Sequence, residues 1–280
     1  MKLSRDAEAR VKALLPGFDL SGATYRGEGL VNQVLIGDGR VVRISRHAWG
    51  PDDLDQEGRV LEIIRDRLAV DVPRWTREAA DVISYPFLEG EPLGGFLVER
   101  WPEEDRRVVA GQIADVLLAI HGITDSSLGP SVTNRDRSVF VALLEELRVE
   151  LVPFLQYWQV EYVEHLFAPV VDGTLSFEHT PVLVNGDLSV YHLICDRDAR
   201  RLSSIIDWGT AGLGDPAVDF ACLIDEYDPA FVSMVCDAYG DVTPFWDRAV
   251  FWSRTLPLQW ALIGLRDPED PAWRFAHSGR

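Results

Sequence analysis

Cysteine is scarce in this sequence. Its 280 residues include three cysteines and no Cys-x-x-Cys pair, which argues against a disulfide framework and against a structural zinc site. Apolar residues neighbour Cys195, Cys222 and Cys236. We therefore interpret all three as buried, inert thiols of a protein that works in a reducing compartment.

Long apolar runs are also missing. No segment approaches the roughly 18 consecutive apolar residues that a membrane-spanning helix needs. The charged start, Met-Lys-Leu-Ser-Arg-Asp, has none of the features of a signal peptide. We expect a soluble, cytoplasmic protein with no membrane partner.

Positive charge is in short supply as well. Lysine and arginine number 27 against 45 aspartates and glutamates, for a formal net charge of −18 at pH 7. Such a chain repels the phosphates of nucleic acids and of anionic membranes, so we expect no nucleic-acid partner. The acidity suits a cationic substrate, and it suits equally well a protein that is acidic only for solubility.

The pattern that is present is a β-rich first third followed by a mainly helical remainder. Two β-rich runs flank Gly37-Asp38-Gly39, which predicts a hairpin, and the Pro- and Gly-rich stretch 86–95 marks a boundary. We expect a two-lobed α+β fold with lobes at residues 1–88 and 89–280. The predicted helices are 4–15, 53–69, 103–121, 136–151 and 156–168, and the predicted strands are 31–36, 41–44, 74–78 and 81–85, with a strand-rich island at 181–207.

Two carboxylates stand out in the strand-rich island. Asp187 and Asp207 each follow a short apolar run, and a predicted hairpin between them brings both to one site. One carboxylate is then placed to take a proton from a hydroxyl, and the other to hold a divalent metal. Phosphoryl transfer needs both tasks, because its catalysis rests on positioning and on neutralising phosphate charge.

The same stretch resembles the catalytic segment of the aminoglycoside and macrolide phosphotransferases, which are relatives of the protein kinases. The family pattern His-x-Asp-x-x-x-x-Asn, Ile-Ile-Asp-Phe/Trp-Gly and Gly-Asp-Pro-x-x-Asp is followed in order and spacing up to Asp215 and Asp219. The resemblance implies that Asp187 is the catalytic residue and that Asp207 binds Mg²⁺. It also implies a kinase-like fold that uses a nucleoside triphosphate, ATP or GTP, to phosphorylate a hydroxyl.

The chain departs from the family pattern at two positions. Asn185 replaces the first His, which has a supporting role. His192 replaces the Asn that supplies the second metal ligand, although Mg²⁺ prefers oxygen donors to imidazole nitrogen. Some 2″-aminoglycoside and macrolide enzymes are similar in carrying His there. We expect His192 to bind metal together with Asp207; the alternative is a hydrogen-bonding residue behind the site.

The resemblance extends more weakly into the first lobe, which it identifies as the nucleotide-binding lobe. Gly27-x-Gly29 and Asn32 resemble a nucleotide-covering loop, although a lone Gly-x-Gly is more typical of an ordinary turn. Arg43 takes the place of the strand lysine that grips nucleotide phosphates, and Glu57 that of its helical partner. The resemblance assigns the interlobe hinge, whose backbone binds the purine, to Ser84, Tyr85 and Phe87.

The substrate-binding residues are the hardest part of the site to predict from the sequence. In the family they come from the helical lobe, where acidic and aromatic side chains suit a cationic antibiotic through charge and cation–π contacts. An aminoglycoside, a cyclic peptide of the capreomycin or viomycin type, and a macrolide all remain open. Acidic residues are equally typical of an ordinary charged surface, and tryptophan is equally typical of a hydrophobic core. The candidates are Asp225, Glu226, Asp228 and Trp260.

Three alternatives stay open. A metabolic kinase for choline, homoserine or a sugar keeps the chemistry and changes the acceptor. A nucleotide-binding pseudokinase module is favoured by Arg43 and His192 and disfavoured by the two aspartates. A zinc hydrolase that uses His179, Asp187 and His192 lacks any familiar ligand spacing.

Overall fold

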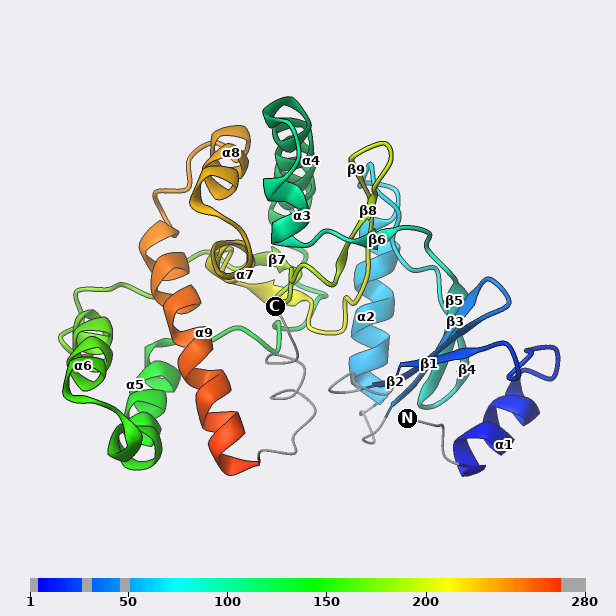
Figure 1. Cartoon of the computed structure of the whole chain (residues 1–280), viewed down its shortest axis with the longest axis horizontal. Helices are drawn as coiled ribbons and strands as arrows, with labels where there is room; N and C mark the ends of the chain where they lie inside the picture. The colour runs from blue at the N-terminus through cyan, green and yellow to red at the C-terminus, as the bar shows by residue number, and fades with distance from the viewer. Residues whose placement is uncertain (1–4, 27–31, 46–50, 268–280) are drawn as a thin grey trace.

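The computed structural model describes residues 5–26, 32–45 and 51–267 of the chain. In this part of the chain a five-stranded antiparallel sheet lies beside a larger, mainly helical body, with helix α2 (Pro51–Ile64) between the two (Figure 1). The predicted α+β fold, β-rich first and helical afterwards, is confirmed. The lobe boundary at residue 88 stays a prediction.

The sheet consists of β1 (Thr24–Arg26), β2 (Asn32–Gly37), β3 (Arg40–Ser45), β4 (Thr76–Ala79) and β5 (Val82–Pro86). Its strand order is β1-β2-β3-β5-β4, with antiparallel neighbours throughout. The predicted hairpin joins β2 to β3, because Asp38 and Gly39 adopt the positive φ angles of 50° and 66° that its tight turn requires. The sequence did not predict β1, since three residues are too few to show an alternating pattern.

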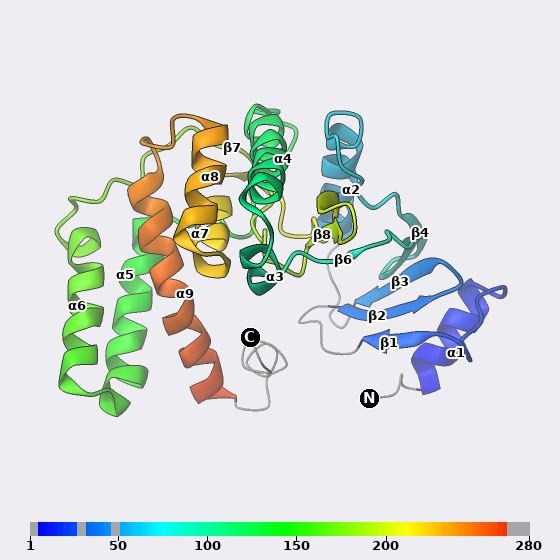
Figure 2. The same ribbon diagram turned by 45° about the horizontal axis from the view of Figure 1, so that its top comes forward.

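Successive side chains of β3 point to opposite faces of the sheet. Val42 packs toward α1 (Arg5–Leu14) in one apolar cluster, and Val41 packs with Leu54 of α2 in another. Figure 2 shows α1 lying beside the strands, away from the helical body. The same alternation turns Arg43 toward α2, where it meets the site described below.

Helix α2 belongs to two apolar clusters. Its first turns pack on the sheet through Leu54, whereas Val60 and Ile64 join the largest core, which is shared with the helical body. The helix was predicted to reach residue 69 and ends at Ile64. The reason is tertiary: the following chain turns so that the Asp71 backbone makes two hydrogen bonds of 2.9 Å with β9 (Arg201–Ile205).

The helical body contains α3 (Gly95–Glu99), α4 (Glu103–His121), α5 (Arg137–Glu146), α6 (Tyr157–Val171), α7 (Ala217–Glu226), α8 (Pro229–Tyr239) and α9 (Trp246–Arg266). α4 has its predicted bounds, whereas the predicted helix 136–151 changes after Glu146 into a π-helical turn, η1 (Leu147–Leu151). A second apolar core lies among α5, α6 and α9, which stand side by side in Figure 2. No helix in the described residues has the length and apolar character needed to cross a bilayer.

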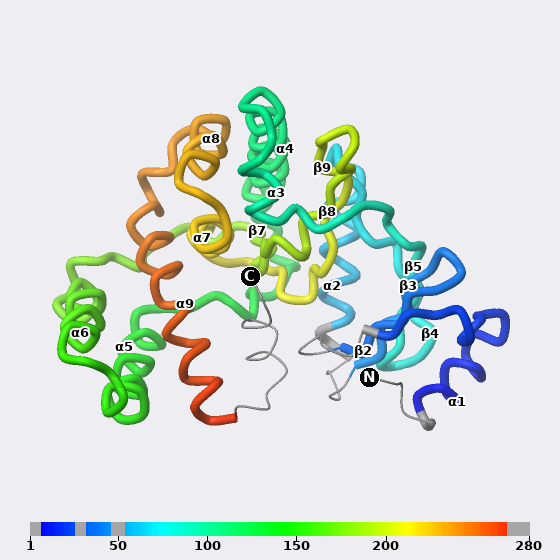
Figure 3. The backbone as a smooth tube through the Cα atoms, viewed as in Figure 1, coloured from blue at the N-terminus to red at the C-terminus, as the bar shows by residue number. Residues whose placement is uncertain are grey.

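Two small antiparallel sheets lie in the middle of the helical body. β7 (Val182–Val184) pairs with β10 (Gly212–Gly214). β8 (Leu193–Asp196) forms a hairpin with β9, and β6 (Glu91–Pro92) pairs with the other edge of β8. These include the strands predicted for the island at 181–207. Figure 3 shows how the chain crosses from β5 through β6 into α3 and so links the sheet to the helical body.

Candidate active site

A turn at the end of β7 presents Asp187. The buried strand leads into Asn185, and Gly186 then takes a φ of +83°, which glycine adopts without strain. A side chain at Gly186 has no room either, because a Cβ would lie 2.6 Å from Thr133 Oγ1. The turn leaves the Asp187 side chain 46% exposed, so its carboxylate is open to a substrate.

The hairpin of β8 and β9 presents the second carboxylate two residues after its last strand. Asp207 has a left-handed φ of +59°, which is uncommon for a residue with a side chain and typical of functional sites. The buried Trp208 indole donates to the Ile205 carbonyl (3.1 Å), and the Gly209 N–H donates to Asp207 Oδ1 (3.4 Å). These bonds hold the turn, and the Asp207 side chain is 42% exposed.

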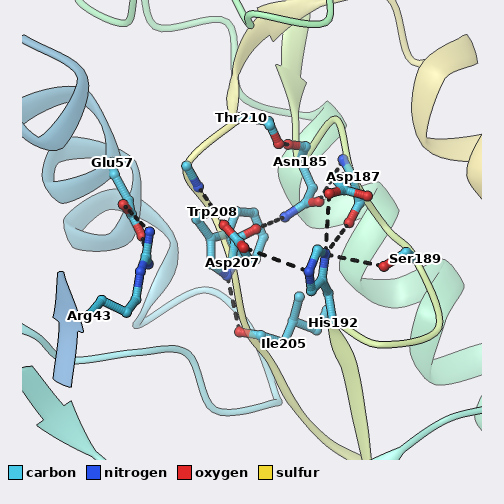
Figure 4. A network of polar contacts seen from close by, with 11 residues as sticks. Arg43, Glu57, Asn185, Asp187, Ser189, His192, Ile205, Asp207, Trp208 and Thr210 are labelled. Atoms are coloured by element: carbon cyan, nitrogen blue, oxygen red, sulfur yellow. Dashed lines mark hydrogen bonds and ion pairs between the residues drawn. The ribbon is translucent and has the colours of Figure 1, made fainter. Parts of the chain in front are cut away.

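His192 lies between the two carboxylates (Figure 4). Its Nδ1 is 2.8 Å from the Asp187 backbone carbonyl, and its Nε2 is 3.6 Å from Asp207 Oδ2. Because a carbonyl can only accept, Nδ1 carries a proton and Nε2 is the atom that faces Asp207. The structure thus brings together Asp187, His192 and Asp207, the three residues that the catalytic motif singled out.

The surroundings shift the pKa values of the two carboxyl groups in opposite directions. Although part of the Asp187 side chain is exposed, the protein packed around its carboxylate removes hydration, and this desolvation raises its pKa against the opposing charge of His192. The carboxylate of Asp207 adds to the rise. Burial also acts on Asp207, but His192 and Arg43 outweigh it and lower the pKa of that carboxyl. Asp187 is therefore the better proton acceptor, and Asp207 is the more persistent anion.

On the sheet side of the site, Arg43 of β3 pairs with Glu57 of α2 (Figure 4). Arg43 Nη1 is 2.8 Å from Glu57 Oε1, and both side chains are buried, with 8% and 1% exposed. Burial disfavours the charge of Arg43, but Glu57 and Asp207 outweigh it and raise the pKa of the guanidinium. A buried pair of this kind keeps the cationic fork in one orientation.

The predicted hinge residues lie at the end of β5. The Ser84 hydroxyl donates to Glu78 (2.6 Å), and the Phe87 N–H donates to the Gly39 carbonyl (2.7 Å), so both donors are already used inside the sheet. Burial raises the pKa of Tyr85 to about 12, which keeps its phenol protonated. Purine binding by the backbone of Ser84, Tyr85 and Phe87 stays a prediction.

The predicted nucleotide-covering loop is placed only in part. Asn32 is the first residue of β2 and lies opposite Ser45 of β3 in the ladder. Gly27 and Gly29 lie outside the described residues. Their part in nucleotide binding stays a prediction.

The predicted substrate residues lie on three helices or at their ends. Asp225 and Glu226 are the last residues of α7, and Trp260 is half-buried on α9. Asp228 caps α8 by accepting two backbone N–H groups at 3.0 Å, and it pairs with Arg106 at 2.6 Å. These contacts give Asp228 a structural role.

The groups that could bind a metal are few. His179, part of the zinc alternative, lies 3.8 Å from Asp215. In the part of the chain that the structure describes, no three His, Cys, Asp or Glu side chains are arranged to hold a metal ion together. Asp207 and His192 could provide at most two ligands, so a Mg²⁺ ion here would need phosphate oxygens and water for the rest. All three cysteines are free, as predicted, but only Cys195 is buried as expected, whereas Cys222 and Cys236 are half-buried.

Behind the catalytic turn, the fully buried Asp219 of α7 organises the backbone. Its carboxylate accepts the N–H groups of Asn185 (3.1 Å) and Gly186 (2.8 Å). It also lies 3.1 Å from His121 Nε2. The Asn185 side chain in turn accepts the Asp187 N–H (3.0 Å), so the residue that replaces the family His supports the predicted catalytic residue directly.

Residues that the sequence did not single out complete this support. Thr210 donates its hydroxyl to the Asn185 carbonyl (2.8 Å), Ser131 donates to the Thr210 carbonyl (2.7 Å), and Thr133 lies 2.7 Å from the Ser131 hydroxyl. Gln56 of α2 bonds to the neighbouring loops. No sequence pattern predicts these roles, because hydroxyl and amide side chains are common in loops and on exposed helix faces.

The fold and the site together define a class of protein. An antiparallel sheet with a buried Arg–Glu pair, next to two aspartates that follow strands of a helical body, is a kinase-like arrangement for phosphoryl transfer. A model of the phosphotransferase enzyme family matches residues 23–252. The chain therefore belongs to this phosphotransferase family.

Its individual relatives are distant. The chain is 27% identical over 195 residues to the uncharacterised protein YcbJ of Bacillus subtilis, a match that spans 64% of this chain and 60% of YcbJ. It is 26% identical over 274 residues to the viomycin phosphotransferase of Streptomyces vinaceus, with 92% of each chain covered. The GDP and kanamycin complex of APH(2″)-IIIa superposes with a TM-score of 0.82 at 20% identity, over 98% of this chain and 97% of that one, and so has the same fold.

Proposed function

We propose that the protein transfers the γ-phosphate of ATP or GTP to a hydroxyl of a cationic antibiotic and thereby inactivates the antibiotic. The observation that carries the chemistry is the placement of Asp187 and Asp207 on either side of His192, with the pKa values of the two carboxyl groups displaced in opposite directions. The acceptor class is supported by the net charge of −18, by a relative named for viomycin and by a fold neighbour that binds kanamycin.

In this mechanism Asp187 accepts the proton of the acceptor hydroxyl. The hydroxyl oxygen bonds to the γ-phosphorus while the bond to the β-phosphate oxygen breaks, and a nucleoside diphosphate leaves. Arg43, whose Nη1 and Nη2 bond to Glu57, donates its remaining N–H groups to the α- and β-phosphates.

The residues around Asp207 fit a divalent cation. Asp207 Oδ2 and His192 Nε2 face each other over 3.6 Å. Burial disfavours the charged imidazole, but the carboxylates of Asp207 and Asp187 outweigh it and raise the pKa of His192, which favours the imidazolium when no metal is bound. A divalent cation would replace the proton on Nε2 and leave the proton on Nδ1, which faces the Asp187 carbonyl. Bound Mg²⁺ supplies charge neutralisation to the phosphates. We propose Asp207 and His192 as its protein ligands.

The test is nucleotide consumption by the purified protein with Mg²⁺ and either ATP or GTP. The acceptor panel contains aminoglycosides, viomycin-type cyclic peptides, macrolides, choline, homoserine and sugars, and Asp187→Ala is the control. Turnover that one antibiotic class stimulates supports the proposal and names the acceptor. Turnover with metabolites alone assigns the protein to the metabolic kinases, and nucleotide binding without turnover across the panel favours the pseudokinase module.

A further inference from the structure

The side chain of Gln56 joins α2 to two loops of the helical body. Its Oε1 accepts the N–H of Gly129 at 2.9 Å. Its Nε2 donates to the carbonyls of Ala211 (2.9 Å) and Pro130 (3.1 Å). Both ends of the amide are therefore used, and the two loops that they reach are far apart in the sequence.

Both loops carry a glycine where Gln56 approaches. A Cβ on Gly129 would lie 2.3 Å from Gln56 Oε1, and a Cβ on Gly212 would lie 2.7 Å from Gln56 Nε2. Neither glycine has a positive φ, so conformational freedom does not explain either residue. At Gly129 the three atoms nearest to such a Cβ all belong to Gln56, which shows how closely the loop and the amide fit each other.

Gln56 lies in the half of α2 that packs on the sheet, next to the residue that binds Arg43. The C-terminal half of the helix is fixed to the helical body by apolar residues such as Val60 and Ile64. The N-terminal half packs on the sheet through Leu54. Gln56 ties that N-terminal half to the helical body as well, one residue before Glu57 and its bond to Arg43. On the other side, Ala211 follows Asp207 by four residues.

We propose that Gln56 is a positioning residue for the nucleotide-phosphate site. Its amide fixes the first turns of α2 to the loop that begins at Asp207, and so sets the separation between the phosphate-gripping Arg43 and the metal-binding carboxylate. The inference rests on the proposed function for the ligand, a nucleoside triphosphate. It adds a residue on α2 that touches neither the nucleotide nor the acceptor.

The chain contains a matched control for this residue. Gln112 of α4 makes the same kind of two-ended contact, because its Nε2 donates to the Leu202 carbonyl (3.2 Å) and its Oε1 accepts the Leu202 N–H (3.0 Å). That contact lies entirely within the helical body. Gln56→Met and Gln112→Met therefore remove hydrogen bonds of the same kind, from amide to backbone, although Gln112 makes fewer of them, and only the first variant loosens α2.

The experiment compares these two variants by calorimetric titration with a non-hydrolysable ATP or GTP analogue and Mg²⁺. We expect both to melt at lower temperature, and Gln56→Met alone to weaken nucleotide binding, by about fivefold to tenfold for the loss of the Gln56 hydrogen bonds, which act indirectly. The KM for the acceptor stays unchanged. Equal nucleotide affinity in Gln56→Met and the wild type overturns the proposal.

The two glycines supply a second test. Gly129→Ala displaces the Gln56 amide and weakens nucleotide binding as Gln56→Met does, and it adds nothing in the Gln56→Ala background, where the space is free. Gly212→Ala also meets the Ser131 nitrogen at 2.5 Å, so Gln56→Ala does not relieve it. Additive effects of Gly129→Ala and Gln56→Ala overturn the proposal.

Amide hydrogen exchange separates this inference from the proposed function. In Gln56→Met we expect faster exchange at Gly129 and in the first turns of α2, whether or not a nucleotide binds. Failure of the wild type to bind any nucleotide refutes the proposed function, and exchange then decides the role of Gln56 in fixing α2. Unchanged protection of α2 in Gln56→Met refutes that role.

Discussion

Asp219→Asn tests whether the shape of the catalytic turn, beyond the presence of Asp187, sets the rate. The buried Asp219 carboxylate accepts the N–H groups of Asn185 and Gly186, and an amide can accept only one of them while its NH₂ faces the other. A hydrogen bond to a charged group contributes about 1.5–3 kcal/mol, and an unpaired buried donor costs about 1–3 kcal/mol. We expect a loss of about 3 kcal/mol in the free energy of unfolding, equivalent to a fall of about 6–12 °C in Tm.

The matched control is Asp215→Asn, which breaks the buried pair of Asp215 with Arg248 of α9. Breaking such a pair costs about 3–5 kcal/mol, so both variants lose comparable stability. Thermal melts and steady-state kinetics well below Tm are measured for both. We expect kcat to fall by about tenfold or more in Asp219→Asn alone, since about 1.4 kcal/mol of misplacement is sufficient, with little change in nucleotide KM. Equal kcat values in the two variants would refute the reasoning.

Three further predictions concern the reaction itself. Asp187→Ala abolishes turnover and keeps nucleotide binding by calorimetry; turnover at the wild-type rate would remove its role as proton acceptor. Glu57→Gln leaves the buried Arg43 without its carboxylate, so nucleotide KM rises by about tenfold in steady-state kinetics, in line with the weight of a charged hydrogen bond; an unchanged KM contradicts the phosphate-gripping role. EDTA abolishes turnover and added Mg²⁺ restores it, and activity that survives EDTA would contradict a metal held by Asp207 and His192.

The sequence predicted that Asp187 and Asp207 lie close to one site, because the determinants of this proximity are local. Asp187 and Asp207 each follow a short apolar strand, and the intervening hairpin leaves little freedom in how they meet. Helix α4 was predicted with its bounds because Pro102 precedes it and Gly122 follows it. A signal for Asp228 was present too, since Asp before Pro229 is a typical helix start.

The residues that the sequence did not predict depend on contacts between distant segments. Gln56 is an ordinary polar residue on a helix until the loops at 129–130 and 211 are in place. The end of α2 was placed too late because backbone pairing with β9, and not helix propensity, stops the helix. Ser131 and Thr210 likewise acquire their roles only when β7 and β10 pair.

The shared core of α2 has a consequence for biosynthesis. The helix and the strand-like segment at Asp71 leave the ribosome early, yet their partner strand β9 begins at Arg201, 130 positions later (201 − 71). At about 5–20 residues per second, translation delivers that partner after about 7–26 s. During this interval the core that Val60 and Ile64 join contains its residues from α4 but lacks its members from Leu183 onward. The nascent chain therefore exposes part of the apolar face of α2 until the later strands and helices are synthesised.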